Sequence, residues 1–202
     1  MKNSLKALVI LTLLVGAGFA SNHFIGAALK ANRPPTQTLP VGRAVPDFRL
    51  TESRGQHVTL ADLKGKVWVA NLMFASCPDV CVRMAEQFAK LDRQLGPRDD
   101  VRLVSITITP DADTPSVLRA YADKLGASEK WWFLTGDRAE IVKLANHGFL
   151  LSAGTAETLT HSDKLVLVDR TGIVRGYFDG GNPESVPRLA AEIARLISVQ
   201  SK

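Results

Sequence analysis

The chain has 202 residues, of which 46% are hydrophobic, enough for one folded domain with an N-terminal extension. Its net charge of +5 arises near the N-terminus, since five of the 25 basic residues precede Asp47, the first acidic residue, leaving 20 basic against 20 acidic side chains. This balance excludes a basic surface that binds nucleic acid by counterion release.

The N-terminal segment, residues 1–29, has the pattern of an export signal or a membrane anchor. Lys2 and Lys6 precede an apolar run from Ala7 to Ala20, and no charged residue occurs between Lys6 and Lys30. The run alone fits a signal peptide, whereas the whole uncharged stretch, about 20 residues, fits a membrane-spanning helix. We expect a retained anchor, with the lysines on the cytoplasmic side of the bacterial inner membrane. A cleaved signal would leave a free periplasmic protein, and in either compartment disulfides persist.

A Pro-rich linker, residues 30–44, precedes the predicted folded domain, residues 45–202. The domain opens with two short strands around a turn at Arg54 and Gly55, followed by a turn of helix. Apolar runs typical of buried strands then alternate with amphipathic runs typical of helices. They predict strand 67–74, helix 78–95, strand 101–109, helix 115–125, strand 130–136, helix 137–146, hairpin 164–180 and helix 184–198.

This order of elements predicts an α/β domain with a mixed sheet flanked by helices on both faces. The helices and strands follow the order βαβα and then ββα. A pair of cysteines stands at the end of the first long strand. Together these features are those of a thioredoxin-like fold, in which the reactive sulfur occupies that strand end.

Cys77 and Cys81 are the only cysteines in the chain. With Cys77 at the N-cap and Pro78 at the first helical position, the two sulfurs would share one helix face, because residues four apart do so. The unpaired N–H groups and the positive dipole end of a first turn favour thiolate over thiol. The pair therefore suits either a soft metal or thiol–disulfide exchange.

Three functions are compatible with this pair of cysteines. A structural disulfide is common in exported proteins, but so short a loop constrains little of the unfolded chain. A thiol–disulfide oxidoreductase would use a redox-active dithiol, although such enzymes mostly have two intervening residues and this chain has three. A copper site would need a further ligand, since Cu(I) is a soft ion that accepts thiolate and imidazole and is satisfied by three ligands.

The further ligand would come from one of four histidines. His23 lies in the apolar leader, His57 in a polar turn, and His147 at a helix end. His161 stands just ahead of the strand that opens the hairpin, in the loop that thioredoxin-like folds bring against the dithiol. From spacing alone, His161 can equally be a metal ligand or an ordinary loop histidine.

Other residues near the cysteines have simpler interpretations. Met73 and Met84 could supply thioether sulfur, but both occupy positions that fit core packing. Asp79, between the cysteines, fits an exposed acid of the first helical turn, where it favours the helix dipole and opposes thiolate formation.

Three segments of the chain read FASCPDVCVRM, VSITITPDADTPSVLRAYADKLGA and THSDKLVLVDRTGIVRGYF. In this order and spacing they resemble the Sco/SenC family of membrane-anchored copper-binding proteins, from about Val45 to the last helix. The resemblance implies copper ligands at Cys77, Cys81 and His161. It also implies delivery of copper to the binuclear centre of cytochrome c oxidase, or reduction of that centre's cysteines. Val82 replaces a proline common in the family, and this departure removes no ligand.

The sequence therefore predicts a copper chaperone rather than a turnover enzyme. Its cargo would be Cu(I) or Cu(II), and its partner the copper-centre subunit of cytochrome c oxidase or another periplasmic cuproprotein. The alternative is a periplasmic thiol–disulfide oxidoreductase that reduces such a partner, and His161 discriminates between the two because a pure reductase has little need of it. A peroxidase is less favoured, because the nearest arginine, Arg83, lies beyond the second cysteine.

Overall fold

The computed structural model describes residues 41–76, 80–151 and 162–199. All of them lie in one compact unit. The predicted leader, Cys77 and His161 lie outside the described residues. Within the described ranges, no helix combines the length and the apolar character needed to cross a bilayer.

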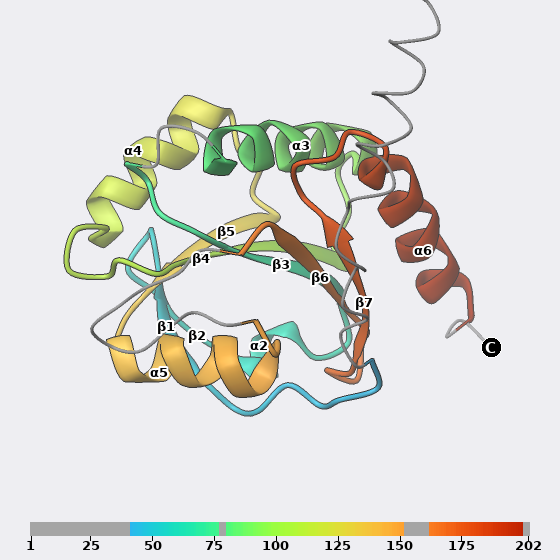
Figure 1. The fold of residues 1–202 in the computed structure, drawn as a ribbon, viewed down its shortest axis with the longest axis horizontal. Coiled ribbons are helices and arrows are strands. Elements are labelled where there is room, and N and C mark those ends of the chain that lie inside the picture. The colour runs from blue at the N-terminus through green and yellow to red at the C-terminus, as the bar shows by residue number, and fades with distance from the viewer. Residues whose placement is uncertain (1–40, 77–79, 152–161, 200–202) are drawn as a thin grey trace, which may run out of the picture. The chain divides into compact units, whose positions relative to one another are not determined.

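Seven strands form one sheet in the order β2-β1-β5-β4-β3-β6-β7 (Figure 1). Their bounds are β1 (Arg49–Glu52), β2 (His57–Thr59), β3 (Val67–Met73), β4 (Val101–Thr107), β5 (Trp131–Thr135), β6 (Lys164–Val168) and β7 (Val174–Asp179). The central strands β3, β4 and β5 are parallel, and every other pairing is antiparallel. The predicted mixed sheet is confirmed.

Helices cover both faces of the sheet (Figure 1). Their bounds are α2 (Leu60–Leu63), α3 (Val80–Leu95), α4 (Pro115–Leu125), α5 (Arg138–Lys143), the π-helical turn η1 (Leu144–Gly148) and α6 (Ser185–Val199). One core cluster lies between the sheet and α3, α4 and α6, and the other lies on the face of α2 and α5. β3 is buried along its whole length because it is covered on both faces.

Local capping chemistry explains the ends of α4. The side chain of Thr114 accepts a hydrogen bond from the Val117 N–H at 3.4 Å, and Pro115 occupies the first helical position. Gly126 ends the helix with φ of 64°, a left-handed conformation that glycine adopts without a Cβ penalty. The predicted bounds of this helix are confirmed.

The helix predicted over residues 137–146 differs in the structure. The α-helix ends at Lys143, and a π-helical turn continues to Gly148. This wider turn leads into Phe149, which is fully buried and packs edge-on against Trp68 with ring centroids 6.0 Å apart. Packing across the core, rather than helix propensity, sets this end of the helix.

The turn between β6 and β7 is built around a buried carboxylate. Asp169 accepts hydrogen bonds from the Thr171 N–H and Oγ1 at 2.8 and 2.7 Å, from the Ile173 N–H at 3.0 Å and from Arg175 Nε at 2.6 Å. Burial opposes ionisation of Asp169, but these hydrogen bonds outweigh it and hold the pKa of the carboxyl below its ordinary value. The ionised carboxylate thus stabilises the fold above the ordinary pKa, and this contribution is lost as pH falls through the lowered pKa.

Candidate metal centre

The described part of the predicted dithiol lies at the carboxyl edge of the parallel strands. β3 and β4 pair in register from Val67 with Val101 to Met73 with Thr107. The chain leaves this edge through Phe74, Ala75 and Ser76, and α3 starts at Val80. Cys81 lies in the first turn of α3 and is 2% exposed. The predicted position of Cys81 at the start of this helix is confirmed, whereas Cys77 lies outside the described residues.

The chain that follows His161 enters the sheet at the same edge. β6 runs antiparallel to β3, and its register pairs Val168 with Trp68 and Leu165 with Asn71. Ser162 and Asp163, which directly precede β6, therefore lie toward the end of β3 from which the cysteine segment departs. Ser162 and Asp163 are the first described residues after His161, which itself lies outside the description.

Gly180 packs closely against both of these chain segments. Its N–H donates to the Asp163 carbonyl oxygen at 2.6 Å. A Cβ atom added at Gly180 would lie 3.0 Å from that oxygen and from Met84 Cγ of α3. Leu165 Cδ2 would also be 3.0 Å away. The absence of a side chain at Gly180 therefore sets how closely the residues after His161 approach the helix of Cys81.

Other candidate ligands named from the sequence lie elsewhere. Met73 and Met84 are 3% and 1% exposed and belong to the core cluster on the α3 side of the sheet, as predicted. His57 and His147 are exposed, and they lie in β2 and η1. Among the residues that the structure describes, no group of three His, Cys, Asp or Glu side chains could hold a metal ion.

A buried acid that the sequence analysis did not single out lies at the same edge. Asp113, in the loop between β4 and α4, is 2% exposed. Its Oδ2 accepts hydrogen bonds from the Ala75 N–H at 3.0 Å, from Thr107 Oγ1 at 2.5 Å and from Thr109 Oγ1 at 3.1 Å. The segment that leads to Cys77 is thus attached to the end of β4 and to the loop that follows it.

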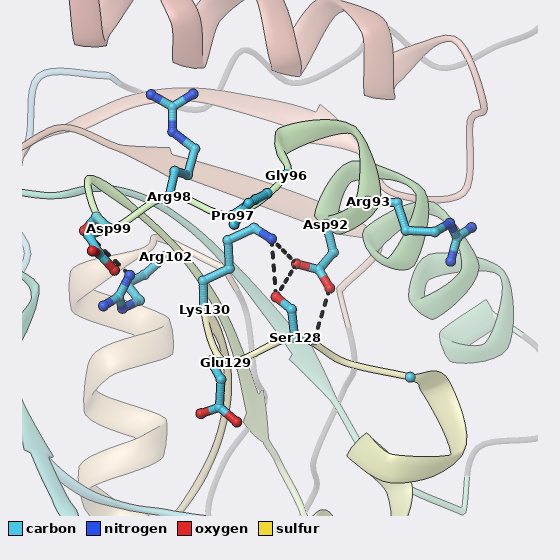
Figure 2. Close-up of a pocket in the computed structure, with 11 residues that line it drawn as sticks. Asp92, Arg93, Gly96, Pro97, Arg98, Asp99, Arg102, Ser128, Glu129 and Lys130 are labelled. Carbon is cyan, nitrogen blue, oxygen red and sulfur yellow. Dashed lines mark hydrogen bonds and ion pairs between the residues drawn. The ribbon is translucent and has the colours of Figure 1, made fainter.

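A cavity of about 490 Å³ lies at the other end of α3 (Figure 2). The best-buried charged groups in it pair with each other: Lys130 Nζ lies 2.6 Å from Asp92 Oδ1, and Ser128 Oγ donates to the same oxygen at 2.6 Å. Asp92 is eleven residues beyond Cys81 on α3, a rise of about 16 Å. The cavity is therefore separate from the candidate metal centre.

Comparison with known proteins places this arrangement in a family. The SCO1/SenC family model matches residues 36–198. The SCO1 protein homolog of Bacillus subtilis is 30% identical over 147 residues, which cover 70% of this chain and 76% of the relative.

Two solved structures extend the comparison. BsSco, a member of the Sco family of cytochrome c oxidase assembly proteins in which a disulfide switch is identified, has a TM-score of 0.71 at 26% identity and covers 81% of this chain and 98% of its own. ScoI of Bradyrhizobium japonicum, solved with copper bound, has a TM-score of 0.63 at 26% identity and covers 78% and 99%. These matches confirm the predicted thioredoxin-like architecture. The chain belongs to the SCO1/SenC family.

Proposed function

We propose that this protein is a copper chaperone that carries one copper ion on Cys77, Cys81 and His161. The main support for the proposal is that the first turn of α3 and the segment that follows His161 lie at the same edge of the sheet. Cys81 is buried in the first turn of α3, and Asp163, two residues after His161, lies beside Met84 of the same helix across Gly180. Membership of the SCO1/SenC family and the copper-bound relative ScoI support the proposal.

The proposed donor set suits copper as cargo. Thiolate and imidazole are ligands that Cu(I) prefers. The first turn of α3, a helix of 16 residues, supplies unpaired N–H groups and a positive dipole end that favour thiolate. Three ligands leave room for a donor from the acceptor protein, so that copper passes by stepwise ligand exchange without release of a free ion.

We infer that the acceptor is the copper-centre subunit of cytochrome c oxidase or another periplasmic cuproprotein. The relation to BsSco, an oxidase assembly protein, supports this acceptor. The lysines and apolar run of residues 1–29 support an anchor in the bacterial inner membrane, with the folded domain on the periplasmic side. Residues 30–44 would then form the tether between the membrane and the domain.

A thiol–disulfide reductase is the second candidate function, and the disulfide switch of BsSco favours it. In this reaction one thiolate of the Cys77–Cys81 pair attacks a disulfide of the partner and forms a mixed disulfide. The other cysteine then attacks the mixed disulfide. The partner leaves with two thiols, this chain keeps a disulfide, and two electrons have passed to the partner.

Copper binding is expected to depend on the redox state of the dithiol. The full-length chain in detergent, fully reduced, should bind one Cu(I) per chain in competition with bicinchoninate. After oxidation of the Cys77–Cys81 pair, binding should be lost, because disulfide sulfurs cannot serve as thiolate ligands. Binding should also weaken at acid pH as the ligands protonate. Equal copper affinity of the two redox forms, or no binding to the reduced form, would contradict the chaperone function.

Alanine in place of Gly180 is expected to weaken copper binding about ten-fold, by analogy with residues that orient metal ligands. The added Cβ would lie 3.0 Å from the Asp163 carbonyl oxygen and from Met84 Cγ, so the segment after His161 would move away from α3. The measurement is the same Cu(I) competition titration. Gly181→Ala is the matched control, because a Cβ there meets only Asp179 Oδ1 at 3.4 Å. Equal affinities of the two variants would show that this packing does not affect the metal centre.

A further inference from the structure

Asp113 is a deeply buried carboxylate that takes no part in the proposed ligand set. At 2% exposure, an ionised carboxylate is destabilising unless it is hydrogen-bonded. Three donors meet its Oδ2: the Thr107 and Thr109 hydroxyls and the backbone N–H of Ala75. The two threonines belong to β4 and its extension, whereas Ala75 belongs to the segment that follows β3. The carboxylate therefore joins the end of β4 to a residue, Ala75, that precedes Asp113 by 38 positions in the chain.

The contact with Ala75 lies just beyond the β-ladder. The β3–β4 pairing ends at Met73 and Thr107, and the next bond runs from the Ile108 N–H to the Met73 carbonyl oxygen at 2.9 Å. The following segment of the β3 chain is held by the Asp113 side chain, with an N–H to oxygen bond of 3.0 Å at Ala75. The chain is thus fixed two residues before Cys77.

We propose that Asp113 is the positioning residue of the dithiol loop, holding Cys77 within reach of Cys81 through the backbone of Ala75. Both copper binding and disulfide formation require the two sulfurs to meet. A contact that restricts the position of Cys77 raises its effective concentration at Cys81 for both events. The copper part rests on the proposed function, whereas the disulfide part requires only the two cysteines.

The test compares Asp113→Asn with Asp169→Asn in the full-length chain. Asp169 is a matched control because its carboxylate is also fully buried and multiply hydrogen-bonded, but it lies at the end of β6, at the opposite edge of the sheet. Asp113→Asn is expected to lower Cu(I) affinity about ten-fold, and Asp113→Ala up to 100-fold. The equilibrium constant for disulfide formation against glutathione should fall about ten-fold in Asp113→Asn, a rise of about 30 mV in reduction potential. Asp169→Asn should lower the thermal unfolding midpoint without changing either quantity.

The outcomes separate this proposal from the chaperone function. If the parent binds no copper, the chaperone function fails, and the glutathione equilibrium still decides the role of Asp113. The role is overturned if folded Asp113→Ala, which removes the acceptor for the Ala75 N–H, keeps the disulfide equilibrium constant within about two-fold of the parent value. Any copper affinity would then also stay within about two-fold, well below the ten-fold effect of an orienting residue. It is also overturned if Asp169→Asn changes the two quantities as much as Asp113→Asn does. If Asp113→Ala does not fold, the same two quantities are measured in Asp113→Asn, which keeps a weaker, uncharged acceptor oxygen for the Ala75 N–H.

Discussion

Serine in place of Cys81 is expected to abolish both copper binding and dithiol exchange. The replacement changes one atom at a site that is 2% exposed, so the surrounding packing is retained. A serine oxygen is a hard, protonated donor and a poor ligand for soft Cu(I). It also cannot form a disulfide with Cys77. A loss of at least about 100-fold in Cu(I) affinity is expected by analogy with structural zinc sites. In those sites roughly 10–16 kcal/mol of binding energy is shared among four ligands, about 3 kcal/mol for each.

The measurement is a Cu(I) competition titration of the reduced full-length chain, together with the thiolate-to-copper charge-transfer band after addition of Cu(II). Val82→Ser is the matched control, because Val82 is the next residue of the same helical turn and is 44% exposed. This control should keep the affinity, the band and the reduction potential of the parent. A Cys81→Ser variant that binds copper as tightly as Val82→Ser would show that Cys81 is not a ligand.

Features of the fold that depend on neighbouring residues could be predicted from the sequence. Thr114, Pro115 and Gly126 define the ends of α4 because capping and left-handed glycine are local chemistry. The apolar run of β3 marks a strand buried on both faces. The π-helical turn before Phe149 could not be predicted in this way, because it follows from contact with Trp68, which is distant in the chain.

In the candidate site too, features set by neighbouring residues could be predicted from the sequence, and features set by distant residues could not. The position of Cys81 in the first turn of a helix follows from the local change from strand to helix pattern, and the structure confirms it. The end of the sheet at which Ser162 and Asp163 lie depends on the antiparallel pairing of β6 with β3, and the local sequence pattern does not specify such long-range pairing. Asp113 was not recognised because its partner, Ala75, is 38 residues away. The sequence does show that Asp113 directly precedes the N-cap residue Thr114. An acidic residue at this position also fits ordinary helix capping, so it does not by itself indicate a role near the cysteines.

Alanine in place of His161 is expected to separate copper carriage from thiol reduction. Removal of the imidazole leaves the two proposed thiolate ligands, so Cu(I) affinity should fall about 100-fold, the contribution of roughly one ligand. The charge-transfer band of the Cu(II) complex should shift or disappear. The disulfide equilibrium with glutathione needs only Cys77 and Cys81, so the reduction potential of the dithiol should stay at the parent value.

The matched control is His147→Ala, which removes an exposed imidazole in η1, on the face of the sheet opposite α3. It should leave copper affinity, spectrum and potential unchanged, which also tests whether surface histidines contribute to the measured binding. If His161→Ala binds copper as tightly as His147→Ala, the three-ligand site is wrong. The dithiol alone would then account for any copper binding, and reduction of a partner disulfide would become the favoured function, because that chemistry requires no imidazole at this edge of the sheet.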